Sequence, residues 1–225
     1  MRKQFSGISR SAIDHDAPAK QTLLDLEQHF VQSYSAMKPR DGSNWQNIVF
    51  DQAIVRVLTT IKNSLYLARR GYVYETALVA RGALEQIAWA RGAKRSISEN
   101  DLINLRVQRE LGKLKSVYPS VGKLYGTLSK YSHFAADTHN LFYAKNNGEL
   151  AVRMADRGTK FISMNWPFIL SDICLVVFEE VYLQNIPILR GMTRSGKLRK
   201  SRFPMKYYKA YYEGLSDIDL SSLFS

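Results

Sequence analysis

The stretch FDQAIVRVLTTIKNSLYLARRGYVYETALVARGALEQIAWAR, residues 50–91, decides the fold class of this chain. Its first half carries apolar residues at the spacing of one α-helical face: Phe50, Ile54, Leu58, Ile61, Leu65 and Ala68. Arg69-Arg70-Gly71 is predicted to end this helix, because it supplies cations and a glycine suited to a left-handed cap. A second helix begins near Tyr72–Glu75 and runs to about Arg91. Since the link is short, the two helices are predicted to pack as an antiparallel hairpin.

Further helices are predicted on both sides of this hairpin. One covers residues 16–37 and ends before Lys38-Pro39, because the residue before a proline avoids the α conformation. Apolar spacing and end signals place three more at residues 98–118, 121–131 and 160–184. Pro167 is expected to kink the last of them or to mark a fresh start.

A turn signal interrupts the helical pattern. Asn146-Asn147-Gly148 lies between two runs of β-favouring residues, which is typical of a two-stranded hairpin. The sequence therefore predicts an all-α bundle of five or six helices with one small β-hairpin near residues 141–154.

Composition limits the class of protein. The chain has 225 residues, of which 45% are hydrophobic, so it can bury a core without a disulfide or a structural metal. Cys174 is its single cysteine, which fits a reducing compartment. The most apolar run, Phe161–Leu183, contains Asp172 and two glutamates, whose charges disfavour membrane insertion. Without a signal-peptide pattern at the N-terminus, we expect a cytoplasmic protein with no membrane partner.

Basic charge is concentrated near the C-terminus. The formal net charge is +12, and residues 190–209 contain eight basic and no acidic residues, so this window carries +8 and the remainder +4. We therefore expect two parts, a helical bundle domain at residues 1–189 and a basic aromatic tail at residues 190–225. Cations bind phosphates, and aromatic rings stack on unpaired bases. The predicted nucleic-acid-binding residues are Arg194, Lys197, Arg199, Lys200, Arg202, Lys206, Tyr207 and Tyr208. The alternative is a solvated tail whose tyrosines pack on the bundle or on a second subunit.

A polar constellation is predicted within the helices. Arg81 and Glu85 are four residues apart, on an otherwise apolar helical face, and can touch. They are interpreted either as a salt bridge at the rim of that face or as part of a polar cleft together with His133. His133 is followed by Asp137 and His139 at a spacing that metal ligands can have, but a further carboxylate or cysteine is missing nearby. A histidine at a helix end is the simpler interpretation, and we expect no metal and no cofactor. The phosphate-loop, Gly-x-Ser-x-Gly and Gly-x-Gly-x-x-Gly patterns are absent from the sequence.

Two of these segments carry a family resemblance. The helix from Gly71 to Glu85 approximates Gly-x-Tyr-x-x-x-Ala-x-x-x-Arg-x-x-x-Glu, and Leu128, Ser129 and His133 supply a later Leu-Ser-x-x-x-His. Over about residues 45–140 the chain resembles bacterial helical domains of unknown function, which are similar in turn to HEPN-like proteins. The resemblance implies a helical bundle and, for some relatives, a role in RNA cleavage or phage defence.

The chain departs from the catalytic pattern of that group. Catalytic HEPN proteins carry an arginine that is separated from their histidine by four to six intervening residues. Before His133 those positions are Gly126, Thr127 and Leu128, and before His139 they are Ser132, His133 and Phe134. Arg81 would have to supply the cation from another helix.

Three functions follow from the sequence. The first is a nucleic-acid-associated helical protein that binds RNA or single-stranded DNA, in a bacterial defence or toxin-type system. The second is a metal-independent ribonuclease in which Arg81, Glu85 and His133 are the catalytic candidates. The third is a non-enzymatic interaction module that forms a homodimer, or binds a protein partner, through its helical hairpin.

Overall fold

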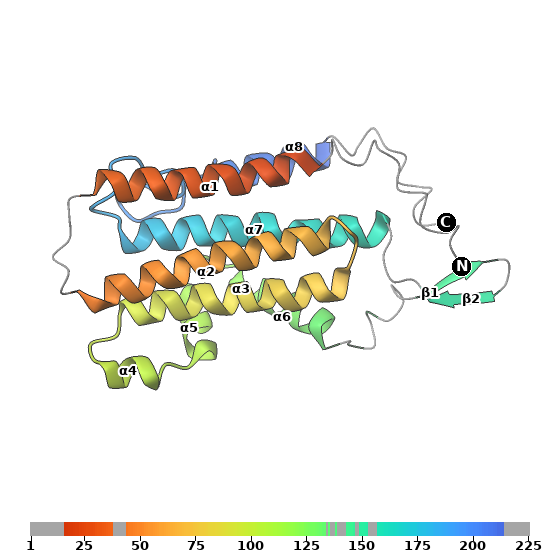
Figure 1. Cartoon of the computed structure of the whole chain (residues 1–225), viewed down its shortest axis with the longest axis horizontal. Helices are drawn as coiled ribbons and strands as arrows, with labels where there is room; N and C mark the ends of the chain where they lie inside the picture. The colour runs from red at the N-terminus through yellow and green to blue at the C-terminus, as the bar shows by residue number, and fades with distance from the viewer. Residues whose placement is uncertain are drawn as a thin grey trace.

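The computed structural model describes residues 16–37, 44–133, 135, 138, 143–146, 149–152 and 157–213. In this part the chain forms an elongated bundle (Figure 1). Its helices are α1 (Ala17–Ala36), α2 (Trp45–Ala68), α3 (Val73–Lys94), α4 (Glu99–Ile103), α5 (Val107–Leu114), α6 (Val121–Ser132), α7 (Arg157–Val181) and α8 (Phe203–Glu213). The prediction of a mostly helical bundle is confirmed.

The predicted hairpin of helices is α2 and α3, which run antiparallel side by side (Figure 1). Gly71 adopts a φ of 77° in the link, a conformation that glycine reaches without steric cost, and its N–H donates to the carbonyl of Ala68 at 2.9 Å. Ile61 and Leu65 are buried as expected, whereas Leu58 is only partly buried. Leu58 therefore lies at the edge of the apolar stripe, where the neighbouring helices cover it only in part.

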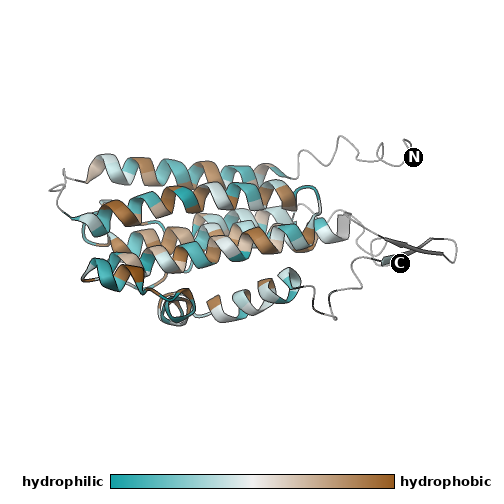
Figure 2. Cartoon of the chain, turned by 60° about the horizontal axis from the view of Figure 1, so that its bottom comes forward, coloured by the Kyte–Doolittle hydropathy of each residue, from teal (hydrophilic) through white to brown (hydrophobic). Residues whose placement is uncertain are grey.

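The helix α3 lies at the centre of the bundle, with α2, α7, α5 and α6 packed around it. A helix with neighbours on several sides needs small side chains for close approach, and the buried residues of α3 are rich in alanine. They include Ala77, Ala80, Ala83, Ala88, Ala90 and Ala93. Hydrophilic and hydrophobic residues alternate along the helices of the bundle, as expected when one face of each is buried (Figure 2).

The apolar segment predicted as a core helix is α7, which packs against α2 and α3 on one side and α1 and α8 on the other. Residues Thr159–Val181 are long and apolar enough to cross a membrane, yet 78% of their most apolar window is buried inside the bundle. The segment therefore has the burial of a core helix in a soluble protein. Pro167 neither ends nor restarts the helix, which runs through it to Val181.

The predicted helix at residues 98–118 is wrong in one respect, because it is divided into α4 and α5. The expected start is present: the Ser98 hydroxyl accepts a hydrogen bond from the Asp101 amide at 3.2 Å, and the Asp101 carboxylate accepts one from the Ser98 amide at 3.1 Å. The Asn104 side chain then donates to the carbonyl of Asn100 at 2.9 Å. Such local side-chain bonds compete with helix continuation, and the first helix ends there.

The segment with the turn signal contains two strands, β1 (Tyr143–Asn146) and β2 (Glu149–Val152), which pair antiparallel with Tyr143 opposite Val152. The residues between them and on either side lie outside the described residues. The structure therefore supports an all-helical bundle as the architecture. A complete β-hairpin over residues 141–154 stays a prediction.

The C-terminal segment requires a correction. Residues 190–213 are not a separate tail, because α8 packs along α1 and α7 (Figure 1), and Met192 and Tyr211 are buried in the common core. The fully buried Glu179 carboxylate accepts the amides of Arg190, Gly191 and Met192 at 2.6–2.8 Å, which fixes the chain as it leaves α7. Within the described residues, the boundary expected at 189/190 does not separate two units.

Candidate functional site

The two helices α3 and α6 bring together a cluster of polar side chains that we call the Arg81 cluster. It consists of Arg81, Glu85, Tyr125, Ser132 and His133. The Arg81 guanidinium donates to the Glu85 carboxylate at 3.0 Å, and its Nη1 lies 2.6 Å from Nε2 of His133. The predicted association of these three side chains is confirmed, although they come from helices separated by about 50 residues of chain.

Sequence analysis missed Tyr125, which links the members of the Arg81 cluster. Its hydroxyl accepts a hydrogen bond from Arg81 Nη2 and donates one to Glu85 Oε1, both at 3.0 Å. Tyr125 lies on α6 one helical turn before Ser129, and only the packing of α6 on α3 shows that it faces Arg81. The hydrogen-bonded ring of arginine, glutamate and tyrosine holds the guanidinium in one orientation.

The Arg81 cluster is accessible to solvent, and the Arg81 guanidinium remains charged. The side chains of Arg81 and Glu85 are partly exposed, and His133 is exposed at the C-terminal end of α6. Partial burial lowers the pKa of Arg81, but the hydrogen bonds that Arg81 donates to Glu85 and Tyr125 outweigh it, so the pKa lies above its ordinary value. Because Arg81 only donates, Nε2 of His133 acts as the acceptor in this contact. The arrangement can present a fixed cation beside an imidazole to an anionic ligand.

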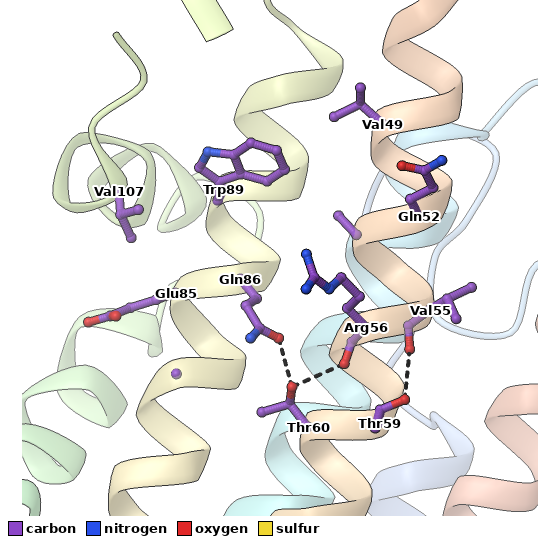
Figure 3. A pocket seen from close by; sticks show the side chains of 12 residues that line it. Val49, Gln52, Val55, Arg56, Thr59, Thr60, Glu85, Gln86, Trp89 and Val107 are labelled. Atoms are coloured by element: carbon purple, nitrogen blue, oxygen red, sulfur yellow. Dashed lines mark hydrogen bonds between the residues drawn. The ribbon is translucent and has the colours of Figure 1, made fainter. Parts of the chain in front are cut away.

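A groove of about 790 Å³ lies between the outer faces of α2 and α3, next to the Arg81 cluster. Glu85 belongs to the Arg81 cluster and also lines the groove. In Figure 3 its side chain extends away from Arg56, whereas the Gln86 side chain points toward Thr60. The Thr60 hydroxyl of α2 donates a hydrogen bond to the side-chain oxygen of Gln86 on α3 at 2.9 Å, and this bond connects the two helices across the groove. Exposed Val55 gives this face an apolar portion.

Three of the predicted nucleic-acid-binding arginines are engaged by the protein itself. Arg202 binds the fully buried Asp172 carboxylate at 2.7–2.9 Å. Arg194 donates to the carbonyls of Leu183, Ile186 and Pro187. Arg199 donates to the Met192 carbonyl at 2.8 Å. Arg202 is thus a structural residue, while Arg194 and Arg199 remain exposed with part of their hydrogen-bonding capacity used.

The two predicted stacking tyrosines also pack on the bundle. The Tyr207 hydroxyl donates to Asp25 of α1 at 2.8 Å, and the Tyr208 ring meets Phe168 of α7 edge to face at 5.8 Å. Burial raises the pKa of Tyr208. Neither ring is presented as a free platform for a base, which corrects the stacking role expected from sequence.

The remaining predicted cations form an exposed set without acidic partners. Lys197, Lys200 and Lys206 are exposed, as is the neighbouring Arg190, and within the described residues none of their side chains is in an ion pair. Sequence analysis overlooked a second basic segment, residues 104–133, which has six basic residues and one glutamate, a net of +5 from 6 − 1. That glutamate, Glu110, is buried and bound to Lys113 at 2.6 Å. A count of charge by window would have found this segment.

No metal centre is present among the described residues, where no group of three or more His, Cys, Asp or Glu side chains is placed to hold an ion. Asp137 and His139, which completed the spacing after His133, lie outside the described residues. Cys174 is fully buried, and burial raises the pKa of its thiol, so it is not a nucleophile in this structure.

No family model, no curated protein and no solved structure matches the chain. The resemblance to HEPN-like proteins therefore stays an expectation from the quoted motifs.

Proposed function

We propose that this chain is a nucleic-acid-binding helical protein that holds the phosphates of RNA or single-stranded DNA with exposed cations. The observation that carries the proposal is that Lys197, Lys200, Lys206 and Arg190 are exposed on one short segment and have no acidic partners in the described residues. The like charges repel one another, and a polyanion relieves this repulsion and releases its own counterions. A role in a bacterial defence or toxin-type system, in the cytoplasm, is the setting that the HEPN-like resemblance implies.

The packing of the C-terminal segment changes the expected mode of binding. A disordered tail would pay an ordering cost when it binds, whereas residues 190–213 are already held by Glu179, Asp172 and α1. The exposed lysines are presented on a fixed surface, and the contacts are electrostatic without stacking by Tyr207 or Tyr208. Binding is therefore expected to show weak sequence preference and strong salt dependence.

The test is a salt titration of single-strand binding by fluorescence anisotropy. For single strands the log–log slope is about −0.7 per phosphate contacted, so the triple change Lys197→Ala, Lys200→Ala and Lys206→Ala should make the slope less negative by about 2. The matched control removes three exposed cations elsewhere, Lys20, Arg56 and Arg70, and should leave the slope nearly unchanged. Equal effects of the two triple changes, or no binding by the unmodified protein at low salt, would refute the proposal.

A second candidate function, metal-independent RNA cleavage, is favoured by the 2.6 Å contact between Arg81 Nη1 and His133 Nε2. In such a reaction the 2′-oxygen attacks the phosphorus and the bond to the 5′-oxygen breaks, which leaves a 2′,3′-cyclic phosphate and a 5′-hydroxyl. When Arg81 Nη1 turns from His133 to the phosphoryl oxygens, whose charge it would stabilise, Nε2 of His133 would be free to accept the 2′-hydroxyl proton, and the protonated imidazole or water would protonate the leaving oxygen. Glu85 and Tyr125 would orient Arg81.

The cleavage test uses RNA with a chelator present, and the same strand with 2′-deoxyribose as a control substrate. His133→Ala and Arg81→Lys should each abolish cleavage by the purified protein, the second because lysine lacks the planar fork. Cleavage of the deoxy strand, or activity that survives in His133→Ala, would exclude this role. If the protein neither binds nor cleaves nucleic acid, light scattering on Leu78→Glu, a change on the exposed face of α3, tests the remaining hypothesis of a dimerising module.

A further inference from the structure

A second pocket, distinct from the Arg81 cluster and from the groove in Figure 3, lies where α3 and α7 end. It has a volume of about 630 Å³, within the range of small-molecule sites. Its walls come from the last turn of α3, the link between α5 and α6, the end of α7 and the turn at residues 192–198. Its lining includes Arg91, Arg95, Ser116, Glu180, Lys197 and Leu198.

The core of this pocket is an arginine that is buried but only partly satisfied. Arg91 is 2% exposed, and its Nε and Nη2 donate to the two oxygens of Glu180 at 2.6 and 2.7 Å. Its third nitrogen, Nη1, is buried and has no hydrogen-bond partner. Buried guanidinium groups normally have all of their donors satisfied, so Nη1 of Arg91 has the capacity for one further acceptor.

The pocket carries excess positive charge. Arg95 also binds Glu180, at 2.8 Å, so one carboxylate serves two guanidinium groups. With Lys197 there are three cations and one anion among the lining residues, a net of +2 from 3 − 1. Arg95 and Lys197 are exposed, and the Ser116 hydroxyl adds a polar group to the lining. This excess of positive charge favours an anionic ligand.

The wall that carries Lys197 is rigid. Thr193 and Lys197 close a tight turn, in which the Thr193 amide donates to the Lys197 carbonyl at 2.8 Å and Gly196 adopts a φ of 78°. Met192 and Leu198 pair across its base. Leu183, Met192 and Leu198 also give the pocket an apolar side. The turn thus fixes the backbone from which the Lys197 side chain extends.

We propose that this pocket binds a phosphate monoester, with the phosphate between Arg91, Arg95 and Lys197 and the organic body against Leu183 and Leu198. Guanidinium groups match a phosphate through paired donors, and Lys197 adds a point charge. The phosphate is either that of a small soluble compound or the terminal phosphate of a nucleic-acid strand. The pocket shares Lys197 with the proposed nucleic-acid-binding surface, but Arg91 and Arg95 belong to the pocket alone, and Lys200, Lys206 and Arg190 do not line it.

Isothermal titration calorimetry of the full chain tests the proposal with inorganic phosphate, adenosine 5′-monophosphate and adenosine. We expect the monophosphate to bind more tightly than phosphate, since it adds apolar contact, and adenosine to give no measurable binding. Lys197→Glu and Arg95→Gln change exposed side chains, so the variants should fold, and each should weaken monophosphate binding about tenfold or more, as expected for a lost charge-assisted contact. Lys20→Glu on α1, an equal change of charge far along the chain, should leave the affinity unchanged.

The source of the phosphate is decided by comparing oligonucleotides with a 5′-phosphate and a 5′-hydroxyl. Tighter binding of the phosphorylated strand, lost in Arg95→Gln, identifies a strand end as the ligand, and equal binding identifies a small monoester. The proposal is overturned if the unmodified protein binds neither inorganic phosphate nor the monophosphate, or if Lys20→Glu weakens monophosphate binding as much as Lys197→Glu. Failure of the Lys200 and Lys206 changes to affect nucleic-acid binding would refute the proposed function alone.

Discussion

Replacement of Arg202 by alanine should destabilise the protein without acting through nucleic acid. The change leaves the Asp172 carboxylate, which is fully buried, with the Tyr118 hydroxyl at 2.8 Å as its side-chain donor within the described part of the chain. Removal of one partner of a buried ion pair costs about 3–5 kcal/mol. The remaining hydrogen bond from Tyr118 and the 14% exposure of the Arg202 side chain favour the lower part of that range, about 3 kcal/mol. Since a domain is stable by about 5–15 kcal/mol, the loss should be large in a urea titration.

Two controls separate this effect from a general loss of charge. Lys200→Ala, two residues away and exposed, should change the free energy of unfolding by less than about 0.5 kcal/mol. Replacing both partners, Arg202→Met with Asp172→Leu, should restore much of the stability, because no buried charge is left unpaired. A loss below about 1 kcal/mol for Arg202→Ala would refute the assignment of Arg202 to the fold, since exposed ion pairs have such values.

Three further predictions concern packing, the C-terminal segment and pH. Gly92→Ala places a methyl group 2.7 Å from a Glu110 side-chain carbon and should lower the free energy of unfolding by about 1–3 kcal/mol in a urea titration. Gly82→Ala in the same helix meets nothing within 4 Å and should raise it by about 0.5–1 kcal/mol. Equal effects would contradict the packing described. Glu179→Ala removes the acceptor of three amides, two of them buried, and should speed hydrogen exchange at residues 190–192 far more than in α2, an expectation that unchanged exchange there would exclude. Burial raises the pKa of the Tyr211 phenol above its ordinary value. The burial of the neutral phenol therefore contributes fully to stability below pH ~10, the ordinary pKa, and this contribution is lost as the pH rises above it. Ultraviolet titration should show more phenolate near pH ~10 in urea than in the native protein.

The helices could be predicted from the sequence because their signals are local. The apolar spacing of Phe50 to Ala68 and the glycine at Gly71 define a helix and its end within the segment itself. Ser98 and Asp101 are another local signal: they are three residues apart in sequence and together cap the N-terminus of α4. The division of residues 98–118 into two helices was not predicted, because a single residue, Asn104, interrupts an otherwise helical pattern through its side-chain hydrogen bond to Asn100.

The Arg81 cluster was partly predictable. Arg81 and Glu85 are one turn apart, so their contact follows from helix geometry alone. The approach of His133 depends on how α6 packs on α3, and it was a hypothesis until the tertiary structure placed it. Tyr125 had no distinguishing signal in sequence, since a tyrosine in an amphipathic helix is most often a core residue.

The sequence alone determined the helical class, the position of the α2–α3 hairpin and the concentration of charge near the C-terminus, because each is a property of neighbouring residues. Only the tertiary structure decided which of the clustered cations are available to a ligand. Arg202 is bound by Asp172, 30 residues away, and Tyr207 by Asp25, 182 residues away. A count of charges cannot reveal such pairs, because the energy of a buried ion pair depends on distance and dielectric in the folded chain and not on separation in sequence.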